Sequence, residues 1–227
     1  SIKSDTYNHP ERAAFYKKHK AVLQMSAMSS GAAGLYFAYT TGPVSFFILL
    51  VMSLLGLSYN LKSIPCMFGN TKVSRIKDVP GSKTILIVIA WGIVTSLLPA
   101  IVNSGQPFPV LVTFVFSTGL VFARTAFFDV LAIQGDRITG KETLPILLGA
   151  QKSYLLIQYV LTIEIFIILA AHGLDLFGNN IFWLAFVPLF MLLLIRLYKK
   201  DSLLSGRQYE ALIESSFLFA GLVGAVI

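Results

Sequence analysis

The sequence has 227 residues, of which 56% are hydrophobic and only 13% are charged. An average soluble domain has roughly 25% charged residues, so the composition excludes an ordinary water-soluble globule and favours an integral membrane protein. The formal net charge of +7 would suit a nucleic-acid partner in a soluble protein. Basic loops beside membrane helices account for such an excess, so we expect no nucleic-acid partner.

Seven apolar runs follow one another along the chain. Each is long enough, at about 1.5 Å per helical residue, to cross a hydrocarbon layer of about 30 Å. We therefore predict an all-α, polytopic membrane helix bundle with seven transmembrane helices. The runs cover residues 21–39, 43–61, 84–102, 108–127, 153–172, 181–198 and 209–227.

The basic residues are sorted between alternate connections of these runs. All 18 Lys and Arg lie in residues 1–20, in the loops 60–83, 128–152 and 198–208, or at the helix ends beside them. The connections 40–42, 103–107 and 172–180 contain none. The positive-inside rule places the basic set in the cytoplasm, so we expect those loops there and Ile227 on the opposite side.

Two polar segments on the basic face carry acidic residues in a related pattern. Asp5-Thr-Tyr-Asn-His-Pro-Glu-Arg12 precedes the first run, and Asp136-Arg-Ile-Thr-Gly-Lys-Glu-Thr143 follows the fourth. This faint internal repeat is of the kind that places a site between two halves of a bundle. A further ionisable residue, Glu164, lies in the middle of the fifth run. It is either functional or protonated and bonded to a neighbouring helix, and the sequence leaves both readings open.

Asp129 and Asp136 are seven residues apart, so on one helix they would project from the same face, about 20° apart. Carboxylates are the ligands that Mg²⁺ prefers, and substrate phosphates commonly complete its shell. By spacing alone, the alternative is an ordinary solvated face of mixed charge. The polar residues around them are Arg124, Arg137, Lys141 and Lys152, and the other large loop supplies Tyr59, Lys62, Lys72, Arg75, Lys77 and Lys83.

The segment Phe128-Asp-Val-Leu-Ala-Ile-Gln-Gly-Asp-Arg-Ile-Thr-Gly-Lys-Glu-Thr-Leu-Pro145 resembles the second aspartate motif of the UbiA superfamily of intramembrane prenyltransferases. Asp5 with His9-Pro10-Glu11-Arg12 is similar to the end of that family's first motif. Ser58-Tyr-Asn-Leu-Lys62 resembles its Tyr/Lys element, with a spacing that is one residue shorter. Ala132 and Ser1 stand where the family motifs have further aspartates.

The resemblance implies a fold of nine helices in which the first motif follows the second helix. Residues 1–227 would then form a single transmembrane prenyltransferase domain that lacks its first two helices. The implied reaction is Mg²⁺-dependent transfer of an isoprenyl chain from a prenyl diphosphate to a hydrophobic or aromatic acceptor, within membrane lipid. Products of this kind include lipid quinones and archaeal-type ether lipids.

The resemblance also implies roles for individual residues. Asp5, Asp129 and Asp136 would be the catalytic metal ligands. The residues that bind the diphosphate would be Tyr59, Lys62, Arg137 and Lys141.

A cation-coupled transporter is the alternative, because two acidic half-motifs could form an ion site. A transporter site lies near the bilayer midplane, whereas these aspartates are predicted at helix ends among cations. That depth favours an enzyme that binds diphosphate.

Overall fold

The computed structural model describes residues 6–8, 10–58, 66–68, 71–73, 81–177, 179–200 and 204–225. Within them the chain is helical apart from a short antiparallel pair, β1 (Cys66–Phe68) and β2 (Thr71–Val73). The helices are α2 (Pro10–Lys18), α3 (Lys20–Thr41), α4 (Pro43–Ser58), α5 (Ser82–Gly92), η2 (Ile93–Leu97), α6 (Leu98–Val102), α7 (Pro107–Leu131), α8 (Ile133–Ile138), α9 (Leu144–Leu148), α10 (Ala150–Gly173), η3 (Asn179–Ala185), α11 (Phe186–Lys199) and α12 (Gly206–Gly224).

The described part of each of the seven apolar runs forms one helix or several helical segments in succession. Four of them are long and apolar enough to cross a membrane: Ser82–Val102, Pro107–Leu131, Ala150–Gly173 and Asn180–Lys199. The apolar helix α4 is shorter, at 16 described residues. Gln24 and several serines dilute the hydropathy of α3, and α12 carries Arg207, Glu210 and Glu214. The protein is therefore a multi-pass membrane helix bundle.

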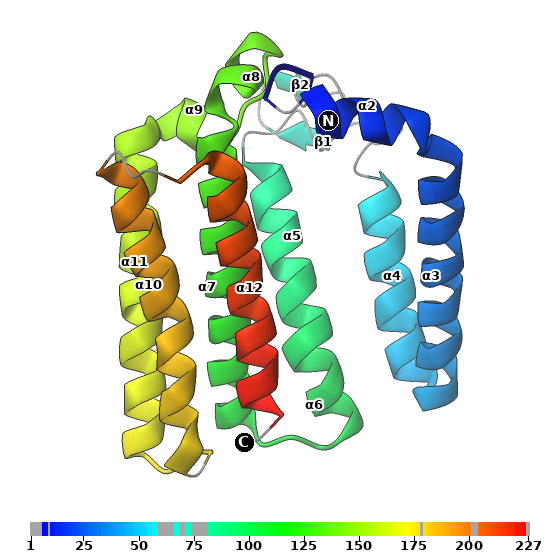
Figure 1. Cartoon of the computed structure of the whole chain (residues 1–227). Helices are drawn as coiled ribbons and strands as arrows, with labels where there is room; N and C mark the ends of the chain where they lie inside the picture. The colour runs from blue at the N-terminus through cyan, green and yellow to red at the C-terminus, as the bar shows by residue number, and fades with distance from the viewer. Residues whose placement is uncertain are drawn as a thin grey trace.

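The core of the bundle lies between α7, α10, α11 and α12. Phe127 of α7, Ile157 of α10, Met191 of α11 and Ile213 of α12 are all fully buried there. Figure 1 shows α3 and α4 side by side, on the far side of α5 from α10 and α11. The bundle is thus one closely packed group of helices with a helical hairpin beside it.

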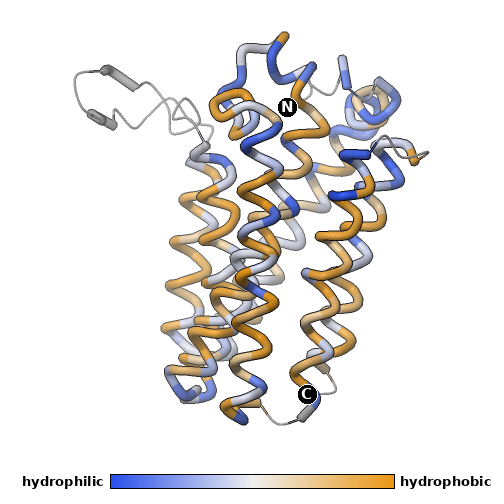
Figure 2. The backbone as a smooth tube through the Cα atoms, turned by 90° about the vertical axis from the view of Figure 1, so that its left-hand side faces the viewer, coloured by the Kyte–Doolittle hydropathy of each residue, from blue (hydrophilic) through white to orange (hydrophobic). Residues whose placement is uncertain are grey.

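The polar segments gather at one end of the bundle. Figure 1 places α2, the β1–β2 hairpin, α8 and α9 together at the top, whereas α6 and the end of α12 lie at the bottom. The tube in Figure 2 is mainly apolar along the helices and polar at the top. Alternate connections therefore lie at opposite ends, as the sorting of the basic residues predicts.

Glu164 is buried where α10 crosses α7, with only 2% of its surface exposed. A Cβ atom on Gly119 of α7 would lie 1.8 Å from Oε1 of Glu164. The glycine therefore provides the space that this side chain occupies between the two helices.

We predict that Gly119→Ala destabilises the bundle, because the added methyl group overlaps a side chain with no free space around it. The expected loss is about 1–3 kcal/mol of unfolding free energy, the usual range for overpacking. Thermal unfolding in detergent would measure it. In a Glu164→Ala background the same glycine substitution should cost little, and an equal loss in both backgrounds would contradict this explanation.

We also predict that Ser104 and Lys152 lie on opposite sides of the membrane. Ser104 lies just before α7 and Lys152 lies in the first turn of α10. These two helices begin at opposite ends of the bundle. Cysteines introduced at each position, in a Cys66→Ser background, should react with a membrane-impermeant maleimide from opposite sides. Labelling of both positions from the same side would contradict the arrangement of helices.

Candidate active site

Asp129 lies in the last turn of α7 and is almost fully buried, with 3% of its surface exposed. The ammonium nitrogen of Lys83 lies 2.8 Å from its Oδ1 atom. The hydroxyl of Thr84 donates a hydrogen bond to Oδ2 at 3.3 Å. Both partners belong to the first turn of α5, so this helix start holds the carboxylate.

Asp136 belongs to α8 and is 2% exposed. Lys141 lies 2.8 Å from its Oδ1 atom, and the backbone N–H of Lys141 donates to the carbonyl of Asp136 at 3.0 Å. Gly140, with φ of 65°, turns the chain back between them, in a conformation that glycine adopts without strain. One short loop thus brings together Asp136, an expected metal ligand, and Lys141, an expected diphosphate-binding residue.

The two aspartates do not share one regular helix, and this corrects the assumption behind their spacing. The helix α7 ends at Leu131, and Ala132 adopts φ of −92° and ψ of 3° before α8 begins. The backbone N–H of Asp136 still donates to the carbonyl of Ala132 at 3.0 Å. The chain therefore bends between the aspartates while both remain buried.

The N-terminal segment contacts this bend through Asn8. Its side-chain amide donates to the carbonyl of Ala132 at 3.1 Å, and its Oδ1 atom accepts from the backbone N–H of Gly135 at 3.0 Å. The first acidic segment therefore reaches the second. Asp5, Tyr59 and Lys62 lie outside the described residues, and Arg137 is exposed beside Asp136.

Ion pairs connect the same end of the bundle to α12. Arg12 of α2 pairs with Glu210, and Arg207 donates to Glu11 at 2.7 Å. The hydrogen bond from Arg207, together with its charge, lowers the pKa of Glu11 below its ordinary value. The pair is therefore present at neutral pH and is lost only as the pH falls through the lowered pKa.

The donor set at this end fits a hard divalent cation. Asp129 and Asp136 are buried carboxylates, and each already attracts an ammonium group to 2.8 Å. Mg²⁺ is commonly held by one or two carboxylates with water and substrate phosphates. The described residues contain no group of three or more metal-binding side chains.

An apolar cavity of about 220 Å³ opens between α4 and α5, next to this polar cluster. Lys83 is the one charged residue in its lining, so the cavity and Asp129 share the same lysine. The remaining lining residues are Met52, Leu55, Gly56, Leu86, Ile87 and Ala90.

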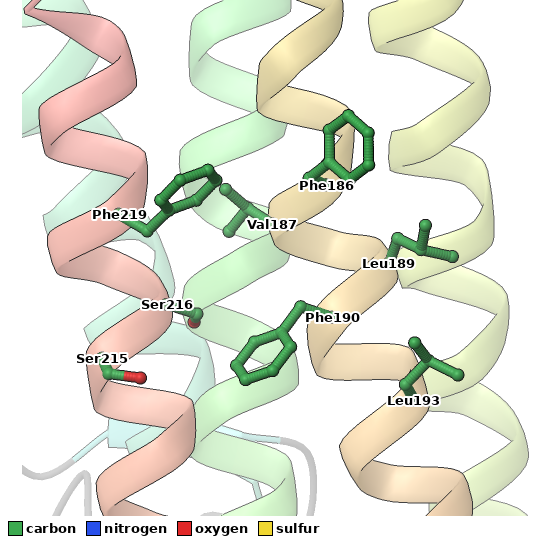
Figure 3. Close-up of a pocket in the computed structure, with 8 residues that line it drawn as sticks. All are labelled: Phe186, Val187, Leu189, Phe190, Leu193, Ser215, Ser216 and Phe219. Atoms are coloured by element: carbon green, nitrogen blue, oxygen red, sulfur yellow. The ribbon is translucent and has the colours of Figure 1, made fainter.

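A larger cavity of about 430 Å³ lies between α11 and α12. Figure 3 shows Phe186 and Phe190 on one side of it and Phe219 with two serines on the other. The hydroxyls of Ser215 and Ser216 donate to the carbonyls of Leu212 and Ile213. This cavity has no charged lining residue and cannot hold a diphosphate.

Sequence reasoning counted Lys83 only among the basic residues of its loop, and it missed Thr84 and Asn8. Lys83 and Thr84 are separated from Asp129 by about 45 positions, and Asn8 lies more than 120 positions before the backbone that it contacts. A basic and a hydroxyl residue in the first turn of an apolar helix are a weak signal for such a role.

Comparison with known proteins identifies the family of the chain. The model of the UbiA prenyltransferase family matches residues 8–219. No curated protein and no solved structure is similar enough to the chain to be compared with it. Because the match covers nearly the whole sequence, including both acidic segments from Asn8 onward, the chain belongs to the UbiA prenyltransferase family and is a prenyltransferase.

Proposed function

We propose that the protein transfers an isoprenyl chain from a prenyl diphosphate to a lipophilic or aromatic acceptor, with Mg²⁺ as its cofactor. The observation that carries this proposal is the cluster of Asp129 and Asp136 with Lys83 and Lys141 at one end of an apolar bundle. Carboxylates for a metal and ammonium groups for phosphate oxygens are the two requirements of a metal-bound diphosphate. Asp5, Tyr59, Lys62 and Arg137 complete the proposed site.

The reaction breaks the bond between the allylic carbon and the diphosphate oxygen, and the bonding electrons leave with the diphosphate. The acceptor then attacks the allylic cation and releases a proton. Mg²⁺, when bound, stabilises the negative charge of the leaving diphosphate. Lys83 and Lys141 add positive charge at the same place, and the surrounding apolar helices exclude water from the cation.

We propose that the isoprenyl chain of the donor lies in the cavity between α4 and α5. It is apolar, and its one charged residue, Lys83, pairs with Asp129. An amphiphile with an anionic head and a hydrocarbon tail would match this change from charged to apolar lining. The head would then lie at the aspartates and the chain between α4 and α5.

The topology is part of the proposal. We propose that α3, α4 and α12 also cross the membrane, giving seven crossings, and that the motif loops face the cytoplasm. The basic residues of those loops support this orientation. Acceptors that fit the family include precursors of lipid quinones, other aromatics and ether lipids.

The position of the site favours an enzyme over the cation-coupled transporter. Asp129 lies in the last turn of α7, and Asp136 lies in the short helix beyond it. Transporter ion sites typically lie near the bilayer midplane. Family membership points the same way.

We predict that Asp136→Ala lowers Mg²⁺-dependent turnover roughly hundredfold or more, because a proposed ligand of the Mg²⁺ that stabilises the leaving diphosphate is lost. Lys141→Ala should lower it about tenfold, mainly through a higher KM for the donor. Release of inorganic diphosphate from geranylgeranyl diphosphate, measured in membranes that contain the protein, would test both. Unchanged turnover in Asp136→Ala would refute the proposed metal site.

We further predict that Ala90→Phe alters donor selection, because the ring fills the α4–α5 cavity. The KM for geranylgeranyl diphosphate should rise more than the KM for dimethylallyl diphosphate. Ile85→Phe is a matched control, since Ile85 belongs to the same helix but lies outside the cavity and is 58% exposed. An equal rise in KM for both donors would mean that the isoprenyl chain lies elsewhere.

A further inference from the structure

Asn8 makes a two-point contact with the backbone between Asp129 and Asp136. Its amide group supplies one donor and one acceptor, which is what the carbonyl of Ala132 and the N–H of Gly135 require. Gly135 is the third residue of α8, where backbone N–H groups have no partner within the helix. Asn8 therefore supplies from another segment the hydrogen bond that this helix start needs.

The contact also requires a glycine. A Cβ atom on Gly135 would lie 2.5–2.6 Å from the three terminal atoms of the Asn8 amide. Real Cβ contacts are essentially never this short, so any larger residue at this position must displace the amide. The identities of residues 8 and 135 are consequently linked by geometry.

We propose that Asn8 is a positioning residue that holds the first acidic segment against the second; this role rests on the proposed function. Asn8 follows Asp5 by three residues, and Gly135 directly precedes Asp136. Fixing Asn8 on Gly135 thus limits how far the metal ligands of the two segments can move apart. Asn8 itself need not touch substrate or metal.

The side-chain chemistry distinguishes this role from simple packing. Aspartate at position 8 would keep an acceptor for the Gly135 N–H. It would lose the donor to Ala132 and place a negative charge against that carbonyl. A positioning role therefore predicts that Asn8→Asp, although nearly identical in size, is impaired almost as much as Asn8→Ala.

The test is a double-mutant cycle on metal binding, with Mn²⁺ as the probe in place of Mg²⁺. Electron paramagnetic resonance would measure Mn²⁺ affinity for the purified complete chain and for Asn8→Ala, Asn8→Asp, Gly135→Ala and the Asn8→Ala/Gly135→Ala double variant. Each single variant should bind Mn²⁺ about 10–100-fold more weakly, as is typical when a residue supporting a metal ligand is lost. The double variant should be no weaker than the single ones, because both substitutions remove one contact.

The control is Asn103→Ala, which removes an amide that bonds to the carbonyl of Pro99 within its own segment. It should leave Mn²⁺ affinity unchanged. The positioning role would be overturned, while the proposed function stands, if the Asn8 variants bound Mn²⁺ as tightly as the unmodified protein. It would also be overturned if the loss of Mn²⁺ affinity in the double variant equalled the sum of the losses in the two single variants. Absence of Mn²⁺ binding by the unmodified protein would instead overturn the proposed function, and with it this role of Asn8. If Gly135→Ala fails to fold, the comparison of Asn8→Asp with Asn8→Ala still decides between positioning and packing.

Discussion

The arrangement of the polar end of this bundle depends on two carboxylates that are withdrawn from water. A buried carboxylate that has no partner is costly, so Asp129 and Asp136 each require a positive partner. Lys83 reaches the first from α5, and Lys141 reaches the second from the loop after α8. The backbone N–H of Gly81 also donates to the carbonyl of Glu142 at 3.3 Å, joining these two segments. Pairing the aspartates therefore fixes where α5 begins and where the α8–α9 loop lies.

The membrane accounts for why this polar cluster lies at an end of the bundle. Charged side chains are costly in hydrocarbon, and apart from Glu164 the charged residues of the long apolar helices lie near the helix ends. The helix α7 extends from Pro107 at one end to Asp129 at the other, so a single helix carries the chain to the site. Apolar length thus sets the depth of the aspartates, and local ion pairs set their orientation.

Much of the fold could be predicted because hydropathy is a local property. The helix α10, for example, is visible in the sequence as an apolar run from Ser153 to His172 with one charged residue, Glu164, and the structure extends it by only a few residues. Lys141 was also expected beside the aspartates, since it lies only five positions after Asp136. The bend at Ala132 was not, because alanine is a good helix former and its propensity gives no sign of a break.

The contacts that the sequence could not supply are those between distant segments. Nothing local distinguishes Lys83 from the other basic residues of its loop, and its role follows only from the packing of α5 against α7. Asn8 is similar, because its contact with Ala132 and Gly135 depends on where the helices bring two remote segments together. Tertiary packing, and not residue type, decides which of many polar residues belong to the site.

The ion pairs between α2 and α12 mainly determine where α2 lies, and they contribute little to stability. Arg207 and Glu11 are both more than half exposed, and exposed ion pairs add little to stability. The stability of α12 comes instead from its buried face, where Tyr209 and Ile213 pack against the core. The pairs fix the position of α2, because Glu11 and Arg12 join this helix to α12. Asn8, which lies just before α2, is bonded to the start of α8. The segment from Asn8 to Arg12 is consequently held at two separate points, so the first acidic segment is kept beside the second by both the bend after α7 and the first turns of α12.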